Sequence, residues 1–210
     1  MARFDTFEFV IRGQGGHAAM PQQLRDPFVA AGQLISSIQS VVARNIDPFD
    51  QGVVSLTFVR GGNVHNVVPD VIEIGGSARS FDEAVQDKIE CRLKAIAQGL
   101  GSALDVSIDI SYDRRIPATV NSSREADLAQ RAARNAIGDE LVDTRFRPSM
   151  GSEDFSWMLA ERPGAFAFIG AGPLVPGKGL HQASYDFNDR LLGIGAAYYA
   201  AIVSEELPII

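Results

Sequence analysis

Two of the three histidines in the sequence stand in glycine-rich stretches, where a side chain of this kind could do chemistry. His17 lies in GQGGHAAMP, residues 13–21, directly after a strand-like segment, and His181 lies in GLHQASYDFND, residues 179–189. Glycine lets the backbone approach a ligand closely, so a histidine there can reach that ligand with its ring. A loop histidine bonded to a nearby carbonyl would give the same pattern, and position alone leaves both interpretations of His17 open.

Further polar residues stand in GGNVHNVVPD, residues 61–70, and at the end of the strand-like segment that follows it. Asn66 fits a functional side chain or a simple turn residue, and its neighbour His65 is expected to face solvent. Arg79 is suited to bind a carboxylate, because its donors match two oxygens. Asn66 and Arg79 are expected at opposite ends of one strand, so they need not share a site within one chain.

A metal site cannot be derived from the histidines by spacing alone. His181 could ligate a metal ion, but structural zinc needs four ligands and catalytic zinc about three protein ligands. Glu153 and Asp154 are candidates, whereas Asp186 and Asp189 fit a turn residue and a helix cap better. The residue chemistry alone therefore predicts a polar site of unknown purpose.

The first part of the chain has the periodicity of an α+β unit. Phe7, Phe9 and Ile11 alternate with polar positions, and Val106 to Asp113 alternates strictly between apolar and polar residues. The predicted elements are strands at 4–12, 53–60, 71–79 and 106–113, with helices at 26–44 and after a capping box at Ser80–Glu83. This β-α-β-β-α-β order predicts a ferredoxin-like, four-stranded antiparallel sheet with both helices on one face. Gly99 and Gly101 are expected to end the second helix.

The pattern changes after residues 114–121. Helices are predicted at 123–137, after the MGSEDFSWM stretch and at about 189–205, while AFAFIG, residues 165–170, is typical of a buried strand. A lone buried strand would leave backbone groups unpaired, which is unfavourable. The second part should therefore complete a larger α/β domain whose other strands lie elsewhere or on another chain.

Composition narrows the class of protein. The net charge of −7 over 210 residues argues against nucleic-acid binding, and the sequence has no apolar run long enough for a membrane span. The start has no apolar segment typical of a signal peptide. A single cysteine, Cys91, excludes an internal disulfide; we expect it to be buried in a helix and the chain to be cytoplasmic.

Taken in order, these stretches resemble the M20 metallopeptidase family, specifically its amidohydrolase branch of hippurate hydrolase-like, N-acyl-amino-acid hydrolase-like and auxin-conjugate hydrolase-like enzymes. The motifs cover almost the whole chain and are individually weak but specific as a set: GQGGHAAMP, DPFVAAGQLI, GGNVHNVVPD, GSARSFD, MGSEDFSWML, PGAFAFIG and LHQASYDFND.

The resemblance implies two domains. Residues 1–117 would form a lid domain that mediates homodimerisation, and residues 118–210 the C-terminal portion of an α/β, zinc-peptidase-like catalytic domain. In the family that domain binds two divalent metal ions, such as Zn, Mn, Co or Ni. The rest of the catalytic domain would be absent from this chain, which would explain the lone strand.

The resemblance also implies roles for individual residues. His17 would be catalytic, reaching across the dimer to steady the oxyanion of the tetrahedral intermediate. Asn66 and Arg79 would contact the substrate carboxylate or the oxyanion, and His181 would be the last metal ligand. Gly151 and Ser152 would line the substrate pocket.

The implied reaction is hydrolysis of the amide bond of an N-acyl amino acid by a metal-bridged water. The other metal ligands and the glutamate general base precede the lid in the family, so only His181 of the metal shell would be present. Gln22 replaces a histidine that often follows the proline of the first motif, which is expected to alter specificity. The alternatives are a non-catalytic dimerisation module and an inactive, truncated gene product.

Overall fold

The structure is a computed structural model that describes residues 1–173 and 179–207. The chain forms two compact units, which are described separately. The first comprises residues 1–119 and 148–156, and the second comprises residues 120–147 together with the described residues from 157 onward. The predicted boundary between residues 117 and 118 remains a prediction.

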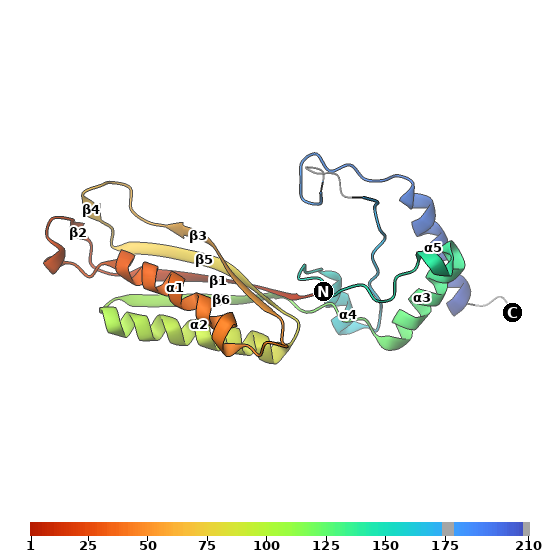
Figure 1. The fold of residues 1–210 in the computed structure, drawn as a ribbon, viewed down its shortest axis with the longest axis horizontal. Helices are drawn as coiled ribbons and strands as arrows, with labels where there is room; N and C mark the ends of the chain where they lie inside the picture. The colour runs from red at the N-terminus through yellow and green to blue at the C-terminus, as the bar shows by residue number, and fades with distance from the viewer. Residues whose placement is uncertain (174–178, 208–210) are drawn as a thin grey trace. The chain divides into compact units, whose positions relative to one another are not determined.

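The first unit is built on a four-stranded antiparallel sheet, as the alternating sequence predicts (Figure 1). The strand order is β3-β5-β1-β6, so β1 lies between two neighbours. The strands are β1 (Arg3–Arg12), β3 (Gly52–Arg60), β5 (Val71–Ser80) and β6 (Ser107–Ile116). Two further strands of two residues each, β2 (Gly16–His17) and β4 (Val67–Val68), pair with each other outside this sheet.

Both long helices, α1 (Pro27–Asn45) and α2 (Glu83–Leu104), pack on one face of this sheet and against each other (Figure 1). The buried side chains of β1, Phe7, Phe9 and Ile11, meet helix positions such as Leu34 and Leu93. Helix α1 begins as predicted: Asp26 accepts a hydrogen bond from the Phe28 N–H at 2.8 Å, and Pro27 occupies the first turn. Hydrophobic burial on this face is the main stabilising term of the unit.

Three predictions about α2 are wrong. Its N-cap is Asp82, which accepts the Ala84 N–H at 2.7 Å, whereas Ser80 is the buried last residue of β5. The helix runs through Gly99 and Gly101 and ends at Leu104, and the C-cap residue Asp105 takes up the left-handed conformation with φ of 52°. Cys91 is exposed, because it lies two residues from the buried Ile89 and therefore on the opposite face of the helix.

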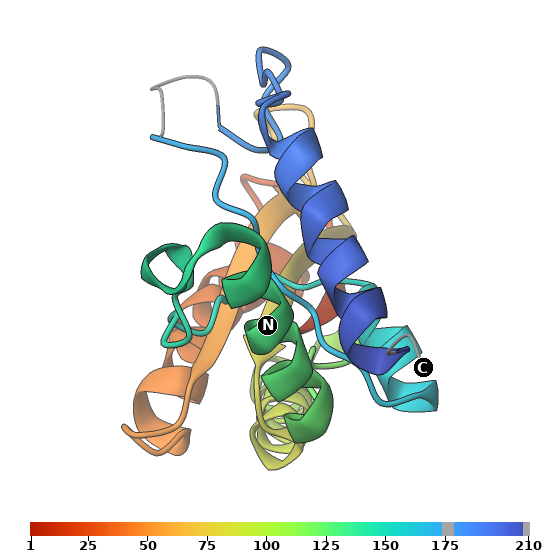
Figure 2. The same cartoon turned by 90° about the vertical axis from the view of Figure 1, so that its right-hand side faces the viewer.

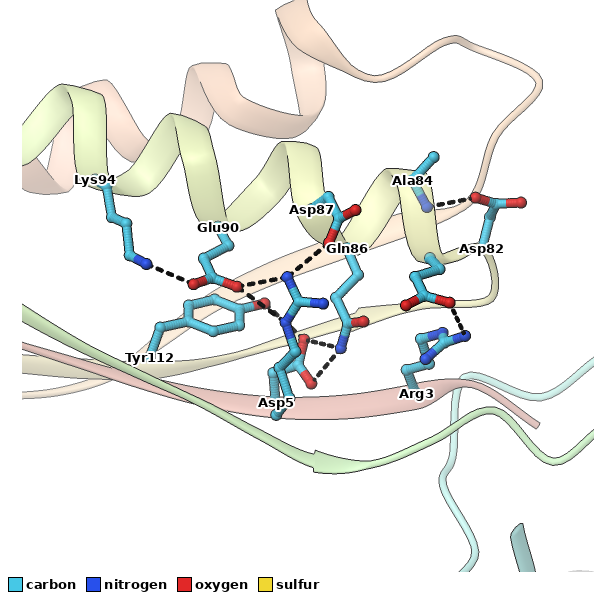
Figure 3. A network of polar contacts seen from close by, with 11 residues as sticks. Arg3, Asp5, Asp82, Ala84, Gln86, Asp87, Glu90, Lys94 and Tyr112 are labelled. Carbon is cyan, nitrogen blue, oxygen red and sulfur yellow. Dashed lines mark hydrogen bonds and ion pairs between the residues drawn. The ribbon is translucent and has the colours of Figure 1, made fainter. Parts of the chain in front are cut away.

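A buried carboxylate joins the sheet to α2 (Figure 3). Asp5 of β1 is 2% exposed. Gln86 of α2 donates to both of its oxygens, at 2.8 and 2.9 Å, and the Tyr112 hydroxyl donates to Oδ2 at 2.6 Å. Burial and the hydrogen bond to Asp5 raise the pKa of the Tyr112 phenol above its ordinary value. These three donated hydrogen bonds replace the water that a buried carboxylate loses.

The second unit contains helices packed side by side, α3 (Ser123–Ile137) and α5 (Leu191–Glu206) (Figure 2). Helix α3 ends at Gly138, as predicted. The described residues also form the short helix α4 (Phe155–Glu161). Two 3-10 turns complete the helical elements of the described residues: η1 (Pro21–Gln23) in the first unit and η2 (Asp139–Leu141) in the second. None of the helices in the described ranges is long and apolar enough to cross a membrane.

The predicted buried strand at residues 165–170 is not formed. These residues are not assigned as a strand, and Phe168 and Ile169 are 55% and 46% exposed. Asn121 binds both the N–H and the carbonyl of Phe166, each at 2.9 Å. The described residues of the second unit include no strand that could pair with this segment, which is why an apolar sequence remains extended and exposed.

Replacing Tyr112 tests the buried carboxylate. Tyr112→Phe removes a donor to a buried charge and should lower the free energy of unfolding by about 1.5–3 kcal/mol near neutral pH. Unfolded tyrosine loses its proton near pH ~10, while the raised pKa keeps folded Tyr112 protonated. Raising the pH beyond this value therefore favours the unfolded state of the wild type, and the gap to Tyr112→Phe should narrow.

Urea unfolding followed by circular dichroism, at neutral pH and again above pH ~10, measures both effects. Tyr185→Phe serves as the control because Tyr185 is an exposed tyrosine. Equal stability of Tyr112→Phe and the wild type at neutral pH would contradict the assigned role of this hydrogen bond.

Candidate functional site

The loop that carries His17 is closed at its base. The loop follows β1. Its two ends are joined at Gln14 and Arg25, which form two backbone hydrogen bonds with each other, of 2.9 and 3.0 Å. The Arg25 side chain donates to Gln14 Oε1 at 2.9 Å and also binds Asp105 at the end of α2. These contacts tie both ends of the loop to the rest of the first unit.

Strands β2 and β4 bring His17 and Asn66 to the same end of the first unit. His17 pairs with Val67, and the Ala18 N–H donates to the Asn66 carbonyl at 3.0 Å. His17, His65 and Asn66 are all exposed, and the exposure of His65 was predicted. The structure thus places two of the predicted site residues, His17 and Asn66, in adjoining loops.

The orientation of the His17 ring is set by its own loop. Nδ1 of His17 accepts a hydrogen bond from the Ala19 N–H at 3.1 Å. A neutral imidazole has one acceptor and one donor nitrogen, so this contact assigns the proton to Nε2. In this tautomer Nε2 carries the N–H donor, and the residue lies at an exposed loop.

Arg79 lies at the other end of β5, together with two other predicted site residues. Its Nη1 donates to the Met150 carbonyl at 2.9 Å and to Ser152 Oγ at 3.4 Å. The guanidinium carbon stands 4.6 Å from the centre of the Phe4 ring. Gly151 is held alongside, since its carbonyl accepts the Ala2 N–H at 2.9 Å. Arg79, Gly151 and Ser152 thus form one cluster within the first unit.

The charge of Arg79 is notable because the described residues provide it with no acidic partner. Its hydrogen bonds go to a carbonyl and a hydroxyl, and the side chain is only partly exposed. Burying an arginine without a counter-charge is unfavourable. Most of its five N–H donors remain available, and their planar arrangement suits a carboxylate.

The two clusters are far apart within one chain. The ten residues of β5 separate the Asn66 side of the sheet from Arg79, and a strand of this length spans roughly 30 Å. The sequence predicts this separation, because Asn66 precedes the strand and Arg79 is near its end. His17 and Asn66 of one chain therefore cannot act on a small molecule held by Arg79 of the same chain.

His181 belongs to the second unit and is exposed, with a φ of 63°. The turn around it is held by the Gln182 side chain, whose Oε1 accepts the Gly179 N–H at 2.8 Å. Within the described ranges, no group of three or more histidine, cysteine, aspartate or glutamate side chains comes together to hold a metal ion. These residues do not fit a complete metal site by themselves, and the metal-ligand role of His181 remains a prediction.

The comparisons with known proteins agree with the motif pattern. The sequence profile of peptidase family M20/M25/M40 matches residues 12–205, so the chain belongs to this family. Hippurate hydrolase of Campylobacter jejuni is 34% identical over 207 residues, which cover 99% of this chain and 53% of that enzyme. IAA-amino acid hydrolase ILR1-like 2 of Arabidopsis thaliana is 36% identical over 212 residues, covering 99% of this chain and 48% of the plant protein.

A solved structure supports the fold. The YXEP protein of Bacillus subtilis, described as a dinuclear metal-binding peptidase of the M20 family, matches with a TM-score of 0.75 at 26% identity. The match covers 99% of this chain and 51% of that chain. The α+β fold is therefore that of M20 peptidases, and the chain spans about half the length of the curated relatives it matches.

Two contacts of the site were not identified from the sequence. The Ala19 amide that binds His17 is a backbone group and leaves no side-chain signal. Asp70 is the last residue of the GGNVHNVVPD stretch, and its Oδ1 accepts the Gly15 N–H at 2.8 Å. Its position directly after a proline at the entrance to a strand is the one signal that could have indicated a local hydrogen bond.

Close contact between the two loops leads to a prediction at Gly15. A Cβ at this position would lie 2.2 Å from the Val68 carbonyl oxygen, a backbone atom. Gly15→Ala should therefore push β2 away from β4 and lower the free energy of unfolding by about 1–3 kcal/mol.

Gly32→Ala is the matched control, because Gly32 lies in α1 with open space around its Cβ position. It should be neutral or stabilise by up to about 1 kcal/mol. Urea unfolding compares stabilities, and hydrogen exchange of the Ala18 amide reports the β2–β4 contact. Undiminished protection of Ala18 in Gly15→Ala would show that the loops are not this tightly packed.

Proposed function

We propose that this chain is a portion of a metal-dependent amidohydrolase that hydrolyses the amide bond of N-acyl amino acids. The observation that carries the proposal is the pair of complementary binding groups. One is the Nε2–H donor of the exposed His17 beside Asn66, and the other is Arg79, for which the residues described in the structure provide no acidic partner. An N-acyl amino acid needs both kinds of group, since its carbonyl becomes an oxyanion and its carboxylate is already charged.

In this proposal His17 and Asn66 stabilise the oxyanion that forms when the amide carbonyl is attacked. Nε2–H of His17 is a donor before the reaction begins, because the Ala19 amide occupies Nδ1. A donor that is already oriented stabilises the developing charge without reorganisation during the reaction. Asn66 can contribute a second N–H from the adjoining loop.

Arg79 would hold the carboxylate of the substrate beside Ser152. Phe4 and the Met150 carbonyl fix the guanidinium plane, while several of its N–H groups stay available. Gly151 and Ser152 would line the pocket at this position. Specificity for N-acyl amino acids with a free carboxylate would follow, because a substrate whose carboxylate is replaced by a neutral amide offers Arg79 no counter-charge.

The separation of the two clusters supports a homodimer. Since His17 and Arg79 of one chain lie at opposite ends of a strand of roughly 30 Å, the oxyanion donors of one subunit would serve the substrate bound by the other. The first unit, with its complete core, would provide the dimer contact. The fold of this unit thereby supports a role in assembly as well as in catalysis.

The second unit supports the view that further residues complete the site. Helix α5 is apolar on all sides from Leu191 to Val203 and has no buried residue, and Leu192 and Tyr199 are 63% and 68% exposed. A helix that is hydrophobic all round is normally covered by other elements. We propose that the remaining metal ligands and the general base belong to a further polypeptide segment, present in the longer family members, that would cover this surface. His181 would be one ligand of the divalent metals.

The first test uses the purified chain. After loading with Zn²⁺ or Mn²⁺ and removal of free ion, elemental analysis should give far fewer than the two metal ions expected of a dinuclear site. The chain should also fail to hydrolyse hippurate or N-acetyl amino acids. Two bound metal ions with metal-dependent turnover would show that the chain holds a complete catalytic centre, and that the proposed division is wrong.

The second test examines His17 in an assembled enzyme. Residues 1–210 would be fused to the part of the Campylobacter jejuni hippurate hydrolase that the match leaves uncovered, and hippurate hydrolysis would be followed. Once the fused protein is shown to hydrolyse hippurate, His17→Ala should lower its kcat by roughly 10²–10³-fold, the effect of losing one oxyanion donor.

His65→Ala is the control, because His65 is an exposed histidine beside Asn66 without a proposed role. Its kcat should equal that of the unmodified fusion. If His17→Ala keeps its kcat and loses only stability, His17 is a structural residue and not an oxyanion donor.

A further inference from the structure

We propose that Asp70 is the positioning residue of His17: its carboxylate fixes the backbone at Gly15, and through it the loop that presents the histidine. This inference rests on the proposed role of His17 in the reaction. Asp70 would not touch the substrate, and it would act only through the geometry of the loop.

The contacts of Asp70 lie at the base of the His17 loop. Its Oδ1 accepts the Gly15 N–H at 2.8 Å, and its backbone carbonyl accepts the Gly13 N–H at 2.9 Å. One residue therefore binds two alternate amides just after β1 ends. Because Asp70 also leads into β5, these bonds connect the loop to the central strands of the sheet.

The loop needs this connection because β2 and β4 are only two residues long. A two-residue ladder is marginal by itself in water. It is supported at one side by the bond from Gly15 to Asp70, and at the other by the bond from Ala18 to the Asn66 carbonyl. His17 lies between these two supports.

The function of Asp70 in this contact is that of an acceptor, and its charge is secondary. The part of the chain that the structure describes contains no lysine or arginine side chain paired with Asp70, and the carboxylate is exposed to solvent. An asparagine Oδ1 could accept the same N–H. Asparagine should therefore preserve the loop, whereas alanine should release it.

A released loop would affect His17 through its tautomer. The Ala19 amide can hold the proton on Nε2 only while residues 17–19 keep their turn. Loss of this turn would free Nδ1, so that both neutral tautomers become populated. The tautomer of His17 is thus a spectroscopic readout of positioning that a general loss of stability would not alter while the chain stays folded.

Nuclear magnetic resonance of the ¹⁵N-labelled chain tests this at about pH 8, above the range in which imidazoles normally titrate. In the wild type, His17 should show an unprotonated Nδ1 and a protonated Nε2, with a protected Gly15 amide. Asp70→Ala should mix the tautomers and speed exchange at Gly15 by about tenfold or more, as expected for one lost hydrogen bond. Asp70→Asn should match the wild type, as should the control Asp50→Ala, which removes another exposed aspartate.

Amides of β1 and β5 report whether each variant is folded. An unchanged His17 tautomer and unchanged Gly15 exchange in folded Asp70→Ala would overturn the proposal. The proposal would also be overturned if Asp70→Asn changed the His17 tautomer and the Gly15 exchange as much as Asp70→Ala does, because the acceptor oxygen would then not be the relevant feature. None of these measurements depends on turnover, so an unaltered kcat of His17→Ala in the fused enzyme would refute the oxyanion role and leave the positioning result standing.

Discussion

The register of β1 against its two neighbours is the constraint on which the first unit depends. Arg12 pairs with Val71 and Arg3 pairs with Ser80, so each end of β1 is fixed to a defined end of β5. A shift by one residue would turn Phe7 and Phe9 away from the helices and abolish the core. The same register determines which loops meet, with the His17 loop at one end of the sheet and the Arg79 cluster at the other.

Most of this unit could be predicted from the sequence because its elements have strong periodicity. The alternation around Phe9 and Ile110 predicts strands, and Asp26 followed by Pro27 predicts the start of a helix. The errors arise where local signals compete. Ser80 has the spacing of a capping residue but is buried as the last residue of β5, and two glycines in α2 are tolerated because the apolar stripe continues past them.

The candidate site was only partly predictable for a different reason. The resemblance to M20 enzymes predicts site roles for His17, Asn66 and Arg79 from side chains in ordered motifs, and the structure places the first two in adjoining loops. The ladder of β2 and β4 is too short to have a period, and the bond from Ala19 to His17 involves a backbone amide. The apolar run at residues 165–170 predicts a buried strand, and this prediction is wrong, because a strand requires a pairing partner that the described residues do not provide.

The buried contact between Tyr112 and Asp5 has a consequence for biosynthesis. The two residues are 107 positions apart, and β1 lies between strands that follow it by many residues. While the chain is being made, β1 cannot complete its pairing until β6 has left the ribosome, and loop closure over such separations makes folding slow. During that interval the apolar face of β1 stays accessible to chaperones, and the first unit acquires its native core only after about half of the present sequence has been translated.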